Sequence, residues 1–150
     1  MSKYILLIIA LSTTSLFSCR TNAEQGRANK PLDADYRLHN IWALTYMNDK
    51  EMSRNDFPRA IPYLEFNLRE KRFMGNNGCK ELVGNFKTKK NQQVISFGKV
   101  TCSKGNCEDN ENSNAFVQLI SRRKYTYEFG RNKLIFKDGD REVLKFKNVD

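Results

Sequence analysis

The sequence predicts a single, mostly β domain that carries one α-helix. Apolar and polar residues alternate in several short runs, the clearest of which places Leu64, Phe66 and Leu68 on one side of a strand. Ten Phe and six Tyr supply aromatic side chains, which are enriched in strands. A helical period occurs in residues 114–123, and a length of 150 residues fits one domain with a preceding segment.

The first elements of the domain are predicted to be two strands joined by a polar loop. Ile41 to Met47 forms the first strand and contains the only Trp, and residues 48–50 turn the chain. Residues 51–59 are polar and predict a loop. Leu64 to Leu68 then predicts a half-buried strand, with Pro62 near its start because Pro has no N–H to donate to a ladder.

A Gly-Asn-Asn-Gly sequence at residues 75–78 predicts a tight reversal after Phe73 and Met74. Gly and Asn reach positive φ at low cost, so this sequence favours a turn over a helix. The chain is expected to resume as a strand pair, residues 84–88 against residues 94–100, around a turn at residues 89–91.

The last third of the chain predicts one helix and two hairpins. In the helix, Asn114 to Arg123, the apolar residues Phe116, Leu119 and Ile120 share a face, and Asn112 or Ser113 is expected to cap the N-terminus. Asp-Gly between alternating apolar runs is a strong hairpin signal. The predicted strands are Tyr125 to Phe129, Lys133 to Lys137 and Glu142 to Lys147, with Asp138-Gly139-Asp140 between the last two.

The N-terminus predicts a lipoprotein signal peptide over residues 1–18. Lys3 supplies positive charge, and an apolar run of signal-peptide length follows, too short to span a membrane. Leu16-Phe17-Ser18-Cys19 resembles the bacterial lipobox, which implies cleavage after Ser18 and lipidation of Cys19. The alternative is an ordinary secretory signal with an unrelated Cys. Residues 19–38 are polar and predict a flexible tether, followed by a domain over residues 39–150.

The formal charge of +9 would suggest nucleic acid for a cytosolic protein. In the bacterial cell envelope that charge meets anionic lipid headgroups first, so we expect no nucleic-acid partner. Acidic residues do not cluster directly after Cys19, which favours the outer membrane facing the periplasm over export to the cell surface. The expected partners are the membrane, through the lipid on Cys19, and either an envelope protein or an apolar ligand.

The order of the motifs resembles the META domain family, in its HslJ-like envelope lipoproteins. The matching pieces are PYLEF (residues 62–66), FMGNNGCKELVGNF (73–86), ISF (95–97), a Thr-to-Cys segment (101–107), AFVQLI (115–120), KLIF (133–136) and VLKF (143–146). The most specific piece is G-x-x-G-C followed by G-x-F. The chain departs from the family at Lys80, where Asn is usual, and in the longer segment TCSKGNC.

The resemblance implies a small antiparallel, incompletely closed β-barrel with one packed α-helix. It implies no established enzymatic reaction and no cofactor, and it links the protein to envelope stress. Related barrels in secretion pilotins hold lipid or peptide. Fold analogy alone does not establish function.

Three cysteines, Cys79, Cys102 and Cys107, remain besides Cys19. In an oxidising envelope we expect a disulfide between Cys79 and Cys107. One alternative is a disulfide between Cys79 and Cys102, and a second is that all three thiols are reduced. Cys107 is preferred because it stands at the end of the Thr-to-Cys segment that the family shares.

Metal binding and catalysis find little support in the sequence. The cysteines with His39 match no familiar zinc spacing, and residues 109–120 lack the Gly and Glu of a calcium loop, so we expect no metal site. The chain has a single His to act as the base that would activate a nucleophile, so we expect no catalytic residues.

Two function hypotheses follow. The first is a non-enzymatic binding or interaction module whose barrel interior or cleft, lined by Trp42, Phe66, Phe86 and Phe97, accepts an apolar ligand or a partner segment. The second is a small hydrolase that uses two carboxylates brought together from distant strands. Two facing acids of raised pKa would favour the hydrolase, whereas a dry aromatic groove would favour the binding module. A purely structural stress protein is a third reading.

Overall fold

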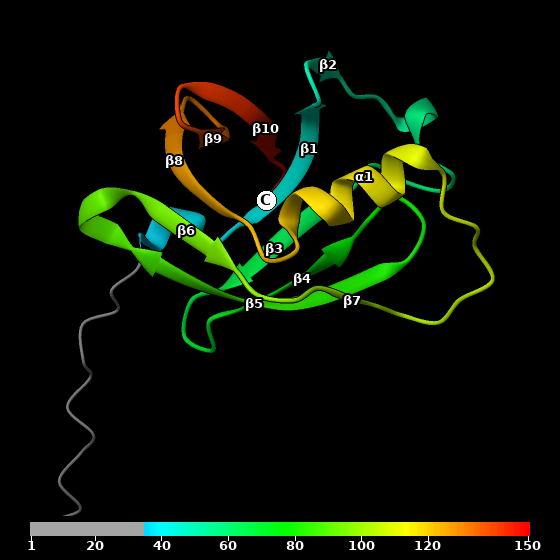
Figure 1. Cartoon of the computed structure of the whole chain (residues 1–150), viewed down its shortest axis with the longest axis horizontal. Coiled ribbons are helices and arrows are strands. Elements are labelled where there is room, and N and C mark those ends of the chain that lie inside the picture. Colours follow the sequence, from blue (N-terminus) through cyan, green and yellow to red (C-terminus); the bar gives the residue numbers. More distant parts are fainter. Residues whose placement is uncertain (1–34) are drawn as a thin grey trace, which may run out of the picture. The chain divides into compact units, whose positions relative to one another are not determined.

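The computed structural model of the protein describes residues 35–150 (Figure 1). The strands are β1 (Ile41–Met47), β2 (Lys50–Glu51), β3 (Tyr63–Asn67), β4 (Arg72–Asn76), β5 (Glu81–Lys89), β6 (Val94–Phe97), β7 (Thr101–Cys102), β8 (Lys124–Gly130), β9 (Lys133–Asp138) and β10 (Arg141–Asn148). The helices are α1 (Glu111–Ile120) and the short 3₁₀ helices η1 (Tyr36–Leu38), η2 (Arg54–Asp56) and η3 (Lys90–Gln92). None of the helices in this part of the chain is long and apolar enough to cross a membrane.

Eight of the strands form a closed antiparallel barrel, in the order β1-β3-β4-β5-β6-β8-β9-β10 and back to β1. The mostly β fold with one helix is confirmed, but the expected incomplete closure is wrong. β1 pairs with β3 on one side and with β10 on the other, where Trp42 lies opposite Asn148 and Met47 opposite Leu144. The barrel closes because β1 and β10, at the two ends of the domain, satisfy each other's backbone groups and leave no free edge between them.

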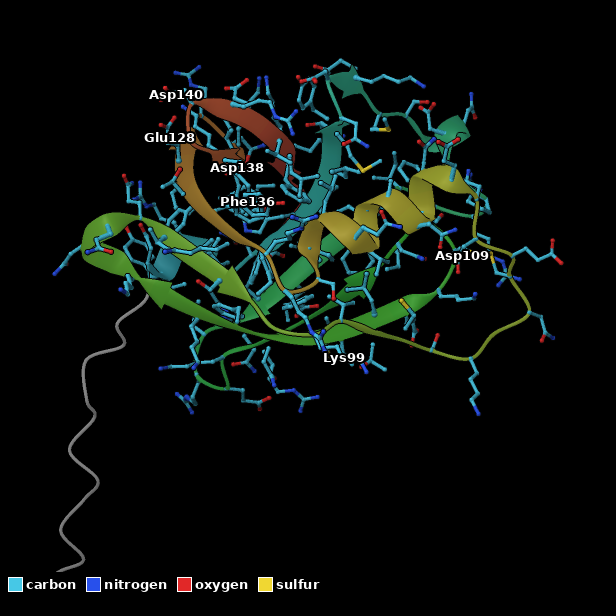
Figure 2. All side chains as sticks on the ribbon, viewed as in Figure 1. Lys99, Asp109, Glu128, Phe136, Asp138 and Asp140 are labelled. Carbon is cyan, nitrogen blue, oxygen red and sulfur yellow. A yellow bond between two sulfur atoms is a disulfide. The ribbon has the colours of Figure 1, made fainter. Side chains whose placement is uncertain are left out.

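The barrel interior is filled with aromatic side chains. Phe66 contacts the rings of Phe73, Phe86 and Phe97, with ring centroids 5.1–6.3 Å apart. Phe136, labelled in Figure 2, stacks on Tyr125 across a centroid distance of 6.0 Å. Each fully buried ring of this kind stabilises the fold by roughly 1.5–3 kcal/mol through removal of apolar surface from water.

Helix α1 runs across the barrel between β1 on one side and β5 with β7 on the other (Figure 1). Its position was predicted, but its bounds were not. Asn110 is the N-cap, because its Oδ1 accepts a hydrogen bond of 2.9 Å from the Ser113 N–H, so neither Asn112 nor Ser113 caps the helix. The helix ends at Ile120, and Arg122 adopts a positive φ of 57° that turns the chain into β8.

The Gly-Asn-Asn-Gly segment is only partly a turn. Gly75 and Asn76 belong to β4, and the chain reverses over the following residues, where Gly78 has a φ of +91°. Gly75 is needed for a different reason: a Cβ there would overlap the carbonyl oxygen of Tyr63 on β3. The prediction of four turn residues was therefore wrong for the first two, because a close approach of two backbones also selects Gly.

The strand pair that follows also differs at its ends. β5 begins at Glu81, three residues before the predicted start, and β6 ends at Phe97 rather than at residue 100. The terminal hairpins were predicted correctly, with Gly139 at a φ of +60° between β9 and β10.

Residues 35–38, expected at the end of a flexible tether, are part of the folded domain. Leu38 on η1 is fully buried, and its carbonyl oxygen accepts a hydrogen bond of 3.2 Å from Trp42 Nε1. The Asp35 carboxylate accepts a hydrogen bond from the Arg37 N–H and thereby caps η1. This helix of three residues, with Leu38 as its one buried residue, is too short to produce an apolar period in the sequence.

Candidate functional site

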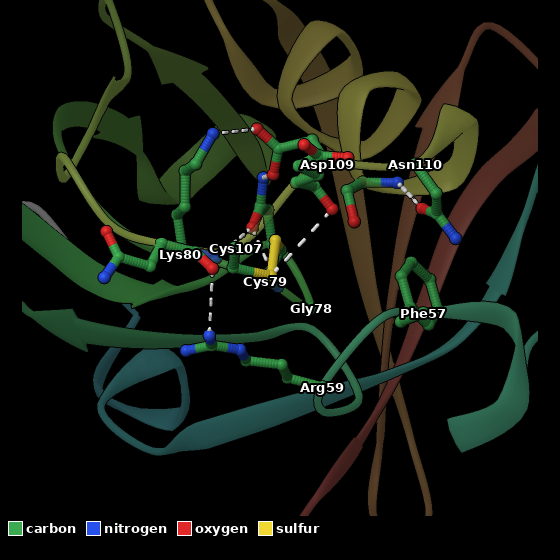
Figure 3. Close-up of a disulfide and its surroundings, with 12 residues drawn as sticks. Phe57, Arg59, Gly78, Cys79, Lys80, Cys107, Asp109 and Asn110 are labelled. Atoms are coloured by element: carbon green, nitrogen blue, oxygen red, sulfur yellow. Dashed lines mark hydrogen bonds and ion pairs between the residues drawn. A yellow bond between two sulfur atoms is a disulfide. The ribbon is translucent and has the colours of Figure 1, made fainter.

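A disulfide between Cys79 and Cys107 ties the turn after β4 to the segment before α1 (Figure 3). The prediction of a disulfide is confirmed. The bond closes a separation of 28 residues, a loop whose closure stabilises the fold by roughly 3.5 kcal/mol on the chain-entropy model.

Asn77 organises the backbone around this disulfide. Its side chain is buried, and its Oδ1 accepts hydrogen bonds from the N–H groups of Cys79 and Lys80, at 3.0 and 2.7 Å. Its Nδ2 donates to Asp109 Oδ1 at 2.8 Å, and Lys80 Nζ pairs with Asp109 Oδ2 at 2.6 Å. We call Asn77, Cys79, Lys80, Cys107 and Asp109 the disulfide cluster.

The electrostatics of the disulfide cluster are those of a structural site. Desolvation alone would raise the pKa of Asp109, but the hydrogen bonds from Lys80 and Asn77 and the charge of Lys80 outweigh it and hold that pKa below its ordinary value. Asp109 therefore stays ionised and paired, and each of its oxygens has a partner. The cluster fixes the turn and leaves no acid ready for proton transfer.

Cys102 on β7 is a free, half-buried thiol. Burial, with a smaller effect of the nearby Asp109 carboxylate, raises its pKa above the ordinary value, so the thiol stays protonated and weakly nucleophilic. His39 is exposed, and its Nδ1 lies 2.9 Å from the carbonyl oxygen of Phe66. Within residues 35–150, the structure brings together no three His, Cys, Asp or Glu side chains that could hold a metal ion.

The four residues predicted to line an apolar groove lie inside the packed barrel. Trp42, Phe66, Phe86 and Phe97 are each at most 5% exposed. Trp42 packs against Phe129 at a centroid distance of 5.8 Å, and all four residues belong to one hydrophobic core. The structure thus brings the four together as part of the core rather than as the lining of an open groove.

A surface pocket of about 460 Å³ nevertheless reaches two of these rings. We call it the β5–β6 pocket, and its volume lies in the range typical of small-molecule sites. Phe86 and Phe97, opposite each other on β5 and β6, form part of its lining. The other lining residues are Glu70, Lys71, Arg72, Asn85, Lys87, Ser96 and Gly98.

The pocket combines aromatic and aliphatic surface with positive charge. Lys71 and Arg72 come from the β3–β4 turn and the start of β4, and Lys87 comes from β5. Arg72 lies opposite Asn85, and Lys87 opposite Ser96, so the sheet register places these side chains on one face. The hydrogen bond from Phe86 N–H to the Lys71 carbonyl, 2.9 Å long, holds the turn beside β5.

Sequence reasoning missed the cations of this pocket. Lys71 and Arg72 lie 15 or more residues before Lys87 in the chain. The register between β4 and β5 brings them together. No pairing between β4 and β5 was predicted from the sequence, so these cations were not placed together.

Two further pockets continue around the same β3–β4 turn. One is lined in part by Tyr36, Arg37 and Arg69, and the other in part by Glu65 and Met74. Glu70 contributes to all three pockets. Cys19, the predicted lipidation site, lies outside the residues that the structure describes.

The fold and site together define a small closed β-barrel with one packed helix, a disulfide-bonded turn and a basic surface pocket. Residues 36–150 match the sequence pattern of the META domain, and the chain belongs to the META domain family. No curated protein matches the chain significantly.

Solved structures support the fold. A protein whose structure was determined by NMR is 16% identical with a TM-score of 0.54, over 75% of this chain and 92% of that one. An NMR structure of a protein from Burkholderia xenovorans is 14% identical with a TM-score of 0.52, over 73% of this chain and 81% of that one. At these identities the similarity concerns the fold alone.

Proposed function

We propose that the protein is a lipid-anchored, non-enzymatic binding module of the bacterial cell envelope, linked to envelope stress. In this proposal an acyl anchor on Cys19 holds the domain on the outer membrane, facing the periplasm. The lipobox-like sequence before Cys19 and the META domain family support this location. An acyl chain contributes about 0.8 kcal/mol per buried CH₂, so a multiply acylated Cys anchors a soluble domain firmly.

The β5–β6 pocket carries the binding part of the proposal. Its volume of about 460 Å³ suits a small ligand, and its lining includes Phe86, Phe97 and basic residues whose stems are aliphatic. The lining has three basic residues, Lys71, Arg72 and Lys87, and one acidic residue, Glu70. The ligand that matches both features is an apolar chain with an anionic headgroup, such as a fatty acid.

The carboxylate-hydrolase hypothesis gains no specific support from the described residues. Asp56, Asp109 and Glu142 each have a pKa below the ordinary value, because each carboxylate accepts a hydrogen bond from a lysine. A general acid needs a raised pKa, so these three groups are not suited to that role.

Titration of the full chain with a fluorescent fatty acid tests the pocket. Asn85→Trp is expected to fill the pocket from its exposed rim and to weaken binding at least tenfold. Lys147→Trp adds the same side chain at an exposed position on β10 that lines none of the three pockets, so it should bind like the wild type. Equal binding by both variants, or no binding by the wild type, would overturn the proposed ligand class.

Native mass spectrometry of membrane-extracted protein, before and after reduction, tests the anchor. Acyl mass on a chain that begins at Cys19 is expected, together with a gain of two hydrogen atoms on reduction of the Cys79–Cys107 disulfide. A mature chain without acyl mass would overturn the proposed anchoring and leave the pocket unaffected.

A further inference from the structure

The β3–β4 turn and the surface around it carry a concentration of cations that the protein itself does not neutralise. Arg69, Lys71, Arg72 and Lys87 are all exposed. Among residues 35–150, none of these four side chains takes part in an ion pair. The acids that line the same pockets are Glu65 and Glu70, so the cations outnumber them by two.

The turn that presents these cations has a defined shape. Lys71 adopts a positive φ of 54°, and Asn67 Oδ1 accepts a hydrogen bond of 3.1 Å from the Glu70 N–H. The Lys71 carbonyl is tied to β5 through the Phe86 N–H. Because the backbone is held at both ends of the turn, the Cα positions from which the turn cations project are fixed.

Exposed apolar side chains lie on the same surface. Tyr36 is 77% exposed and lines the pocket that contains Arg69, and Met74 is 52% exposed and lines the pocket that contains Arg72. Tyr is enriched where proteins meet the membrane–water interface, since one end of its ring is apolar and the other polar. The surface therefore pairs positive charge with partly apolar contacts.

The start of the described chain lies at this surface as well. Asp35 caps η1, and Tyr36 and Arg37 on η1 line the pocket next to the β3–β4 turn. The chain therefore enters the folded domain beside this surface. The acidic side chains Glu128, Asp138 and Asp140 lie along β8, β9 and the turn that follows, outside the lining of the three pockets (Figure 2).

We infer that the surface formed by Tyr36, Arg69, Lys71, Arg72, Met74 and Lys87 docks the domain onto an anionic lipid bilayer. The cations contact the headgroups, while Tyr36 and Met74 enter the interfacial layer. The inference rests on the proposed envelope location, because only there does this surface meet a membrane. The β5–β6 pocket, which shares Lys71, Arg72 and Lys87, would then open towards the lipid from which an anionic amphiphile enters.

Hydrogen exchange on the full chain reconstituted into vesicles tests the docking. Amides of residues 67–72 are expected to exchange more slowly in phosphatidylglycerol vesicles than in phosphatidylcholine vesicles, and high salt should remove the difference. Exchange around the β9–β10 turn serves as the internal reference. Equal exchange of residues 67–72 in both lipids would overturn the inference.

Charge reversal identifies the residues. In Arg69→Glu/Lys71→Glu, the docking equilibrium should fall by roughly fivefold for each cation removed, and further because negative charge is added. Lys104→Glu/Arg141→Glu makes the same charge change at exposed positions that line none of the three pockets, so it should keep the protection. Thermal unfolding of each variant checks the fold, and Lys87→Glu provides a third variant on a strand rather than on the turn.

The outcomes separate docking from the proposed function. An acylated protein that binds fatty acid but leaves its turn unprotected would overturn the docking inference alone. Protection that survives Arg69→Glu/Lys71→Glu unchanged would overturn it too. Lipid-dependent protection in a protein that binds no free fatty acid would support docking while the pocket proposal fails.

Discussion

Gly75→Ala is expected to destabilise the domain strongly, because the added methyl group would meet backbone that cannot rotate away. An alanine Cβ would overlap the Tyr63 carbonyl oxygen and lie 2.9 Å from the Tyr63 carbonyl carbon and 3.2 Å from Leu64 Cα. Gly75 lies opposite Leu64 in the β3–β4 ladder, so the two strands must separate to make room. Side-chain adjustment offers no relief, since the nearest atoms are all main chain.

The expected loss follows from two contributions. Overpacking costs about 1–3 kcal/mol. Weakening one or two ladder hydrogen bonds adds about 0.5–1.5 kcal/mol each. Ala also has less conformational freedom than Gly in the unfolded chain, which offsets about 0.4–1 kcal/mol of this loss. The net decrease in the free energy of unfolding is therefore roughly 2–4 kcal/mol, which corresponds to a midpoint shift on the order of 1 M in urea.

Gly105→Ala is the matched control for the urea titration. A Cβ at Gly105 would have nothing within 4 Å, so this variant should unfold within about 1 kcal/mol of the wild type. Equal midpoints for the two variants would show that the backbone approach at Gly75 does not explain why glycine stands there. A change in the urea m-value, by contrast, would point to an altered unfolded or native compactness rather than to a simple loss of stability.

The remaining predictions concern the disulfide cluster and the helix. Cys79→Ser/Cys107→Ser should lower the free energy of unfolding by roughly 3.5 kcal/mol, measured by urea titration, and adding reductant should then change nothing further in this variant. Asp109→Asn should cost roughly 1–2 kcal/mol at neutral pH, because it removes the charge that pairs with Lys80. The pKa of Asp109 is lower in the folded state than in the unfolded state. The ionised carboxylate therefore stabilises the fold at a pH above its unfolded-state pKa, and this stabilisation is lost as the pH falls through the folded-state pKa. The stabilities of the wild type and Asp109→Asn should converge in acid, and a difference that stays constant with pH would contradict this role of Asp109. Ser113 is fully buried and its Oγ has no hydrogen-bond partner among residues 35–150, so Ser113→Ala should leave the thermal midpoint unchanged or raise it, whereas a loss above about 1 kcal/mol would reveal a partner.

Local pattern was enough to predict the elements whose side chains alternate or repeat within a short stretch. The bounds of β1 were predicted because a nearly continuous apolar run ends at a turn. The hairpin of β9 and β10 was predicted because alternating strands flank an Asp-Gly turn. Closure of the barrel was not predicted, because the strands that close it, β1 and β10, lie at opposite ends of the domain sequence. Thr45 Oγ1, for example, donates a hydrogen bond to the carbonyl oxygen of Lys145, 100 residues away. No local signal distinguishes a strand pair that closes a ring from two strands at open edges.

The site shows the same division between local and distant information. Cysteine count and compartment predicted a disulfide, and the resemblance pointed to the pair Cys79 and Cys107. The role of Asn77 was not predictable from local sequence. Its side chain accepts a hydrogen bond from the Cys79 N–H within the turn and donates another to Asp109, 32 residues away. Trp42 was expected to line a groove, but aromatic rings at inward positions of a small barrel fill its core.

The positions of the family motif and of the cations suggest how one scaffold could serve different ligands. Within the motif of residues 73–86, Gly75 and Asn77 shape the β3–β4 ladder and the disulfide-bonded turn of this chain. Lys71 and Arg72 directly precede that motif, and Lys87 directly follows it. Substitution at these flanking positions would change the charge of the β5–β6 pocket and of the docking surface without disturbing the turn. Ligand class would then be set beside the motif rather than within it, and exchanging the three cations for neutral residues should alter binding while the unfolding midpoint stays the same.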